Sequence, residues 1–331
     1  MKRIIKIILS ILLFLLIAVF CFLFVGSPEP AEDIKWGVNF SKEHSRNLGL
    51  DWKENYNAVL EDLDADHLKI VAYWTWIEPQ RDQYNFDNLD WQIERAAEED
   101  AKLLLVMGQR VPRWPECHFP GWVKELSTEE RQEEIMELTE KIVKRYKDEE
   151  AIWAWQVENE PFFSFGECPP PDEDFIKKEV ESVKEMDPSR PVVVTESGEW
   201  PFWFKAAQYG DIVGTTLYRE VWMSEWNRYF KYPLPPVFYQ RKAKLINWIF
   251  DKKVINVEMQ TEPWGPELMY DISLEEQKKT MDLEQFKKNI DYARRTGLDT
   301  FYLWGSEWWY WLKTNHNQPQ IWNEASKLFS N

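Results

Sequence analysis

The sequence contains few of the residues that hold metals or phosphate groups. Its 331 residues include four histidines, three cysteines without a CxxC pair, and only 12 glycines. Metal centres need clustered ligands, and phosphate-binding turns need closely spaced glycines. We therefore expect no metal site and no other cofactor.

Basic residues are also fewer than acidic ones: the chain has 40 Lys and Arg and 57 Asp and Glu, which gives a formal net charge of -17. The first 26 residues contain Lys2, Arg3 and Lys6 and no acid, so the rest of the chain is more acidic still. Such a surface repels phosphate backbones, and nucleic acid is not expected as a partner. Apolar residues make up 44% of the chain, which excludes a disordered protein.

One long hydrophobic run lies near the N-terminus. From Ile7 to Val25 only Ser10 is polar, and this length can cross ~30 Å of hydrocarbon as a helix. The basic flank should stay in the cytoplasm, so the bulk of the chain is expected outside it. A cleaved signal peptide, and hence a secreted protein, is the alternative. The run exceeds a usual signal core, however, and GSPEP after it offers no A-x-A-like site.

We accordingly expect three parts: a membrane anchor or uncleaved signal at 1–26, a linker at 27–33, and a folded domain at 34–331. Within the domain, apolar runs alternate with amphipathic segments. Several runs are continuously apolar, which is typical of parallel strands covered on both faces. The predicted strands are 35–40, 67–74, 101–108, 151–157, 191–196, 211–218, 253–258 and 300–304.

The segments between these strands have helical periodicity, most clearly after Ser127, where a capping box to Glu130 is predicted. Eight strand-then-helix units in ~300 residues predict an α/β fold, a (β/α)8 barrel. A doubly wound open sheet is the alternative, but it lacks support because no Gly-rich phosphate turn is present. In a barrel, functional residues lie where strands end.

Acidic residues gather at three of these strand ends. WQVENEP places Glu158 and Glu160 after the fourth strand, Glu196 ends the fifth, and Glu258 ends the seventh, with Glu262 four residues later. Cleaving a glycosidic bond requires an acid for the departing oxygen and a carboxylate for the sugar carbon. Strands four and seven lie nearly opposite each other in a barrel, so their carboxyls can converge at the ~5 to 5.5 Å typical of retaining enzymes.

These motifs resemble the clan A glycoside hydrolases, including the family 5 cellulases and mannanases, over Trp36 to about Trp311. The resemblance implies that Glu160 of the Asn-Glu-Pro motif is the acid/base and that Asn159 binds the sugar 2-hydroxyl. It also implies that Glu258 is the nucleophile. Tyr218 would orient Glu258, and Trp304 would floor the cleavage subsite.

The stretch from Trp74 through Ile77-Glu78-Pro79 resembles the family's W-x-x-I-E-P sequence after strand two. The chain departs from the family 5 pattern at three positions, with Lys69 for an arginine, Thr216 for a histidine and Asp82 for a glycine.

Further predictions rest on the position of residues relative to the strand ends. Trp74, Trp264 and Glu196 are predicted substrate contacts, because they follow strand ends and indoles can cover pyranose faces. Glu262 is the alternative nucleophile, and Glu158 is expected to be a structural acid. Cys117 and Cys168 fall in neighbouring loops, so we hypothesise a disulfide between them.

The expected function is a membrane-anchored retaining glycosidase acting on β-linked oligo- or polysaccharides. An ionised Glu258 about 5 Å away would repel the charged form of Glu160 by ~3 kcal/mol at a dielectric of about 20, so Glu160 should keep its proton. A transglycosylase with the same residues and a non-catalytic carbohydrate-binding barrel remain alternatives. Sugar identity, endo or exo action and oligomeric state are not determined by the sequence.

Overall fold

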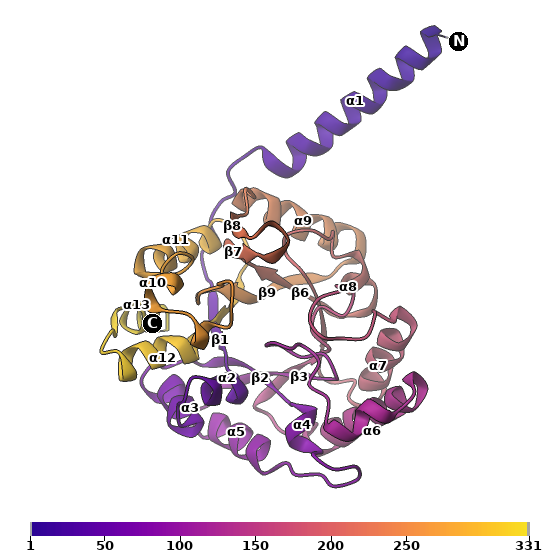
Figure 1. Cartoon of the computed structure of the whole chain (residues 1–331). Coiled ribbons are helices and arrows are strands. Elements are labelled where there is room, and N and C mark those ends of the chain that lie inside the picture. Colours follow the sequence, from indigo (N-terminus) through magenta and orange to yellow (C-terminus); the bar gives the residue numbers. More distant parts are fainter. Residues whose placement is uncertain (1, 330–331) are drawn as a thin grey trace.

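The computed structural model describes residues 2–329 and contains a closed barrel of eight parallel strands ringed by helices (Figure 1). The strands, in barrel order from β1, are β1 (Lys35–Asn39), β10 (Thr300–Trp304), β9 (Lys253–Gln260), β6 (Ile212–Leu217), β5 (Val192–Glu196), β4 (Ile152–Val157), β3 (Lys102–Met107) and β2 (His67–Val71). The predicted (β/α)8 fold is confirmed.

Helices cover the outside of the barrel because the strands are apolar on both faces. The longer ones are α3 (Trp52–Glu61), α5 (Asp87–Glu98), α6 (Thr128–Tyr146), α7 (Glu173–Met186), α9 (Pro236–Phe250), α11 (Leu283–Arg294) and α12 (Ser306–Asn315). Short helices lie among them: α2 (Lys42–Asn47), α4 (Trp74–Ile77), α8 (Phe204–Tyr209), α10 (Leu274–Gln277) and α13 (Gln320–Ala325). The predicted capping box between Ser127 and Glu130 is confirmed at the start of α6.

Three apolar clusters hold the barrel together. The largest fills the space between strands and helices, and a small one fills the barrel interior with Leu104, Ala154, Val193, Ile255, Val257 and Tyr302. A third joins β2 and β3 through Val71, Tyr73, Val106 and Val111. The interior is therefore packed below the mouth, as barrel cores are. Functional side chains have room only at the strand ends.

Two local differences from the predicted strands affect the mouth. β9 continues past Glu258 to Gln260, because Met259 and Gln260 still pair with β10. An antiparallel hairpin, β7 (Glu220–Met223) and β8 (Arg228–Lys231), extends from the loop after β6 and was not predicted. Gln260 joins the two features, since its side-chain oxygen accepts from the backbone N–H groups of Arg219 and Glu220.

The N-terminal helix α1 (Lys2–Phe24) extends away from the barrel beside α9 (Figure 1). Its residues 3–24 are long and apolar enough to cross a membrane, and most of their surface is exposed. Phe24 packs against Phe238 of α9, with ring centroids 5.3 Å apart.

Candidate active site

Glu258 lies in β9 at the mouth of the barrel and has a donor for each carboxylate oxygen. Its Oε1 accepts from Lys69 Nζ of β2 at 2.8 Å, and its Oε2 accepts from the Tyr218 hydroxyl at 3.0 Å. Lys69 is fully buried, so its ammonium charge needs this carboxylate as a partner. The two contacts fix the carboxylate plane. Lys69, at the position where family 5 has an arginine, thus contacts the predicted nucleophile.

Glu160 follows β4 and has fewer hydrogen-bond partners for its carboxyl than Glu258 has. Its backbone is left-handed (φ 44°), and its N–H donates to Thr195 Oγ1 at 2.7 Å, which holds this uncommon conformation. One carboxyl oxygen accepts from the Thr216 hydroxyl at 3.3 Å. Burial raises the pKa of Glu160 well above its usual value, and the charges of Glu258, Glu199 and Glu116 raise it further. Glu160 therefore holds its proton.

Tyr218 lies within the electrostatic influence of both carboxyls, Glu160 and Glu258. Burial raises the pKa of its phenol well above the usual value, and the charges of Glu258 and Glu160 add to the effect. The Tyr218 hydroxyl is bonded to Glu258, and the charge of Glu160 also acts on it, so the three side chains belong to one group at the strand ends. Trp264 closes one side, with its ring edge-on to Tyr218 at a centroid distance of 5.1 Å.

Glu116 is a further carboxyl of this site that the sequence reasoning missed. Asn159 Nδ2 donates to its Oε2 at 3.4 Å, and Gln156 Nε2 holds the Asn159 oxygen at 3.1 Å. Burial raises the pKa of Glu116 to about 8, and the Glu258 charge contributes. We name Lys69, Glu116, Glu160, Tyr218 and Glu258 the Glu258 cluster.

The loop after β3 holds Glu116 in place. Cys117, the next residue, forms a disulfide with Cys168, which confirms the predicted pairing. Glu116 has a left-handed backbone (φ 74°), and Gly166 packs so closely that an added Cβ would lie 2.7 Å from the Glu116 Cβ. The only sequence feature that could have indicated Glu116 is that it directly precedes Cys117 of the predicted disulfide.

A second charged group lies beside the first and surrounds Arg113. This guanidinium forms a bidentate pair with Glu262, whose Oε2 is 3.1 Å from Nη2, and also contacts Glu307 at 3.3 Å. His44 Nε2 lies 3.6 Å from Glu262. We name His44, Arg113, Glu262, Trp304 and Glu307 the Arg113 cluster. Glu262, the alternative nucleophile, is thus engaged in a buried ion pair.

Trp304 belongs to this second cluster. The Arg113 guanidinium carbon lies 4.0 Å from its ring centroid, and the indole is only 7% exposed. The ring is therefore largely covered by protein.

Two predicted substrate contacts have partners within the protein. Trp74 is fully buried; its Nε1 donates to Glu78 at 2.8 Å, and its ring packs edge-on against Trp122. α4 begins at Trp74 shortly after β2 and buries the indole, which does not fit the predicted contact with substrate. Glu196 accepts from the Ala206 N–H of α8 at 3.1 Å and supports that helix.

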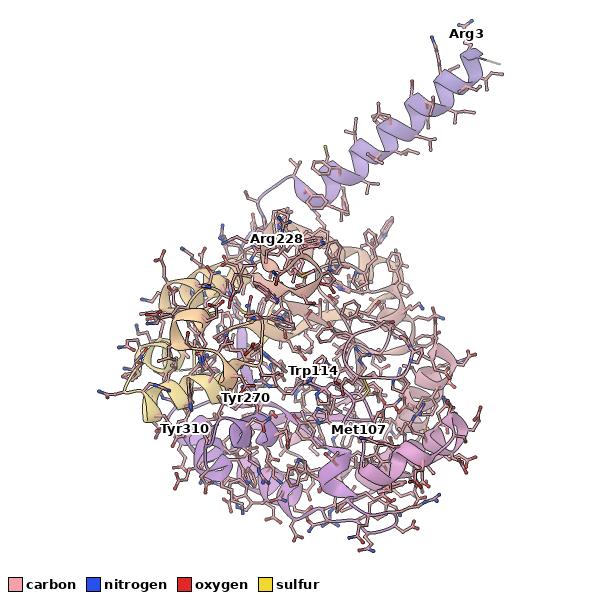
Figure 2. All side chains as sticks on the ribbon, in the orientation of Figure 1. Arg3, Met107, Trp114, Arg228, Tyr270 and Tyr310 are labelled. Carbon is pink, nitrogen blue, oxygen red and sulfur yellow. A yellow bond between two sulfur atoms is a disulfide. The ribbon has the colours of Figure 1, made fainter. Side chains whose placement is uncertain are left out.

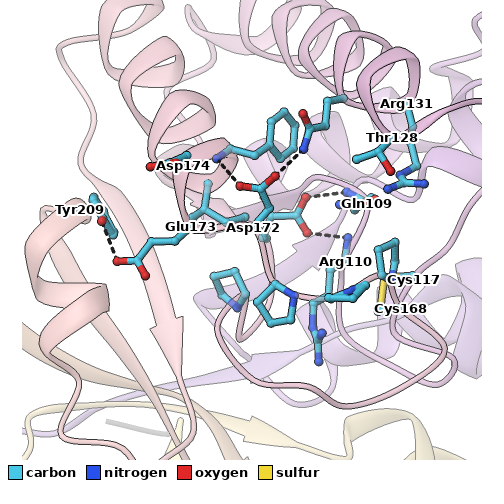
Figure 3. Close-up of a pocket in the computed structure, with 18 residues that line it drawn as sticks. Gln109, Arg110, Cys117, Thr128, Arg131, Cys168, Asp172, Glu173, Asp174 and Tyr209 are labelled. Atoms are coloured by element: carbon cyan, nitrogen blue, oxygen red, sulfur yellow. Dashed lines mark hydrogen bonds between the residues drawn. A yellow bond between two sulfur atoms is a disulfide. The ribbon is translucent and has the colours of Figure 1, made fainter.

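Glu158 lies on the far side of the strand-four loop from Glu160. Its carboxylate accepts from the backbone N–H groups of Gln109 and Arg110, at 2.9 and 2.6 Å (Figure 3). It lines a cavity of about 600 Å³ between α6 and α7 that includes neither Glu160 nor Glu258. These bonds tie the loops after β3 and β4 together, as expected for a structural acid.

Aromatic side chains surround the mouth. Trp114, in the loop after β3, lies over the middle of the barrel in the view of Figure 2. The described residues with large exposed apolar side chains also include Phe163, Trp200, Trp226 and Tyr270, each in a segment that follows a strand.

Residues 50–175 match the family model Glyco_hydro_42, Beta-galactosidase. No match was found among curated proteins. Solved structures with a similar fold include β-galactosidase from the Antarctic haloarchaeon Halorubrum lacusprofundi, with 15% identity over 82% of this chain and a TM-score of 0.54. The chain spans only 52% of that protein's length.

Two further structures are similar over 82% of this chain. GH5_18 from Bifidobacterium longum has 14% identity, 70% of its own length covered and a TM-score of 0.58. Xylanase 10B from Thermotoga petrophila, solved with xylobiose, has 16% identity, 82% of its length covered and a TM-score of 0.54. At these identities the likeness concerns the fold. The chain is a closed (β/α)8 barrel whose fold is similar to that of these glycoside hydrolases, and residues 50–175 match a glycoside hydrolase family model.

Proposed function

We propose that this protein is a retaining glycoside hydrolase that cleaves β-glycosidic bonds by double displacement. The observation that carries the proposal is the contrast between two neighbouring carboxyls. Glu258 has Lys69 and Tyr218 as fixed donors, whereas Glu160 is partly buried beside other carboxyls that raise its pKa. One group is thus prepared to attack and the other to donate a proton.

In the first half-reaction, a Glu258 oxygen bonds to the anomeric carbon while the bond to the glycosidic oxygen breaks. That oxygen takes the Glu160 proton, and the leaving sugar departs. Esterification removes the Glu258 charge, so the pKa of Glu160 falls. Glu160 then takes a proton from water, whose oxygen attacks the anomeric carbon and releases Glu258.

The substrate contacts proposed here are Asn159, Tyr218 and Trp264. Asn159 would bind the 2-hydroxyl, and its amide is already oriented by Gln156 and Glu116. Trp264 is half-buried and can offer its free face to a pyranose ring. The names of the similar structures suggest β-galactosides, β-mannosides and β-xylosides as the first compounds to test.

A mechanism-based 2-deoxy-2-fluoro glycoside with a good leaving group tests the proposal. A retaining enzyme is trapped as a covalent adduct, which peptide mass mapping should place on Glu258. An adduct on Glu262 would overturn the assignment. Turnover with inversion at the anomeric carbon would overturn the double displacement itself.

The proposal includes a membrane anchor with the barrel outside the cytoplasm. It is supported by the exposed apolar surface of α1 and by the basic residues at the start of that helix. The disulfide between Cys117 and Cys168 agrees with an oxidising compartment. Alkaline extraction of membranes should leave the full chain in the pellet. Release into the supernatant would refute the anchor.

A further inference from the structure

Helix α9 carries two stripes of side chains where a barrel helix needs only one. The inner stripe, including Val237, Phe238 and Ile246, is buried against the barrel. An outer stripe consists of Arg241, Lys244, Leu245, Trp248 and Ile249, which follow one another at the spacing of a single helix face. We name these five residues the outer α9 stripe.

The apolar part of this stripe is strongly exposed. Trp248 is 84% exposed and Ile249 is 52% exposed. Phe204 of α8 extends the same surface, since it is 41% exposed and its ring lies 5.9 Å from that of Phe250. A contiguous exposed apolar surface on a helix face indicates an interaction site.

The charge of this helix differs from that of its neighbours. Among the described barrel helices of eight residues or more, α9 alone contains no acid, although Asp251 caps its C-terminal end. The outward residues of the stripe are basic and apolar, in a chain whose formal charge is -17. Basic side chains next to a tryptophan favour an anionic, amphiphilic surface.

The stripe also lies next to the candidate membrane span. Phe24, at the end of α1, packs on Phe238, and the Arg241 guanidinium carbon lies 5.3 Å from the Phe22 ring centroid. In Figure 1, α1 leaves the barrel at the side covered by α9. If α1 crosses a bilayer, α9 is therefore the barrel helix closest to its surface.

We propose that the outer α9 stripe docks the barrel onto the surface of an anionic lipid bilayer. Trp248 and Ile249 enter the interface, and Arg241 and Lys244 contact lipid headgroups. The inference rests on the proposed membrane anchor and is independent of the glycosidase assignment. Because α9 runs alongside the strands, docking lays the barrel on its side, and the mouth opens along the membrane surface.

Quenching of tryptophan fluorescence by brominated lipids tests this docking. The first tryptophan of the sequence is Trp36, so α1 contributes no signal and any quenching comes from the barrel. The full chain is placed in nanodiscs of phosphatidylcholine and phosphatidylglycerol whose acyl chains are brominated near the headgroup. We expect the quenched fraction to fall at least twofold in Trp248→Phe. Trp114→Phe, which removes a 47% exposed tryptophan in the loop after β3, over the middle of the barrel in Figure 2, should leave it unchanged.

A second variant tests the electrostatic part. Lys244→Glu should lower the quenching, as should replacement of phosphatidylglycerol by phosphatidylcholine. Equal quenching in wild type and Trp248→Phe overturns the docking alone. Failure of the chain to co-elute with the discs overturns the anchor and the docking together. Nanodiscs that carry two copies of the wild-type chain but one copy of Trp248→Glu would show that the stripe binds a second copy of the chain. That result would also overturn the proposal.

Discussion

The Glu258 cluster and the Arg113 cluster lie side by side at the barrel mouth and are built from similar residues, yet their charges are balanced differently. In the Arg113 cluster the Arg113 guanidinium contacts both Glu262 and Glu307 and stacks on Trp304. In the Glu258 cluster Lys69 contacts only Glu258. The carboxyls of Glu160 and Glu116 accept hydrogen bonds from neutral groups, the Thr216 hydroxyl and the Asn159 amide. The shortage of positive charge leaves protonated carboxyls available for chemistry.

The comparison teaches that an acid at a strand end is insufficient to identify a catalytic group. Burial raises the pKa of Glu262 to about 7, but Arg113 opposes that rise and occupies both of its oxygens. For Glu160 the charge of Arg110 lowers the pKa, but burial and three neighbouring carboxylates outweigh it. The partners of each carboxyl decide its role.

The largest expected effect is the difference in kcat between a variant of the Glu258 cluster and a variant of the Arg113 cluster. Glu258→Gln should lower kcat roughly 10³-fold or more, because it removes the attacking oxygen. Glu262→Gln should lower kcat far less and act mainly on stability. Steady-state kinetics corrected for folded protein by circular dichroism will measure both. Equal losses in the two variants would remove the distinction between the clusters.

The Arg113 cluster should respond most strongly in stability. Arg113→Met leaves two buried carboxylates without their cation and should lower the free energy of unfolding by about 3–5 kcal/mol. Equilibrium unfolding in urea measures this change in the free energy of unfolding. Arg81→Met is the matched control, because the Arg81 side chain that pairs with Glu134 is 55% exposed and its loss should destabilise the protein far less. A similar loss in both variants would contradict the structural role of Arg113.

The role of Lys69 can be separated from simple packing. Lys69→Met removes the donor that holds one oxygen of Glu258, so kcat/KM should fall about 10- to 100-fold. Lys69→Arg keeps the charge and the donor and should restore much of the activity. Equal kcat/KM in Lys69→Met and wild type would indicate that the ion pair has no role in the reaction.

The smallest expected effect concerns Glu116. Glu160 must be protonated to act as an acid, so activity is lost as the pH rises through its raised pKa. Glu116, whose raised pKa is about 8, is negative in the alkaline range; Glu116→Gln removes that charge, lowers the pKa of Glu160, and should move the alkaline limb of kcat/KM to lower pH. An alkaline limb that stays in place would show that Glu116 does not act on Glu160.

Much of this architecture was predictable because it depends on local pattern. The eight barrel strands were found from continuous apolar runs, and the positions of Glu160 and Glu258 followed from the rule that barrel strands present their functional residues at the ends. The disulfide was predictable once Cys117 and Cys168 had been assigned to neighbouring loops. Each inference used only strand order and residue type.

The errors and omissions share a physical cause. Trp74 was expected at the substrate, but α4 begins at that residue and buries the indole against Trp122. Glu116 and Arg113 come from a long loop whose backbone includes left-handed residues, so no periodicity indicates where their side chains lie. The β7–β8 hairpin follows β6 so closely that its strands were not distinguished from loop.

The sequence by itself determined the barrel, the order of its strands and the two carboxyls that end strands four and seven, because hydrophobic periodicity and strand polarity are local properties. Only the tertiary structure decided which carboxyl pairs with which cation. That choice depends on contacts between residues far apart in the chain, such as Lys69 with Glu258 and Arg113 with Glu262, whose energies depend on distance and burial.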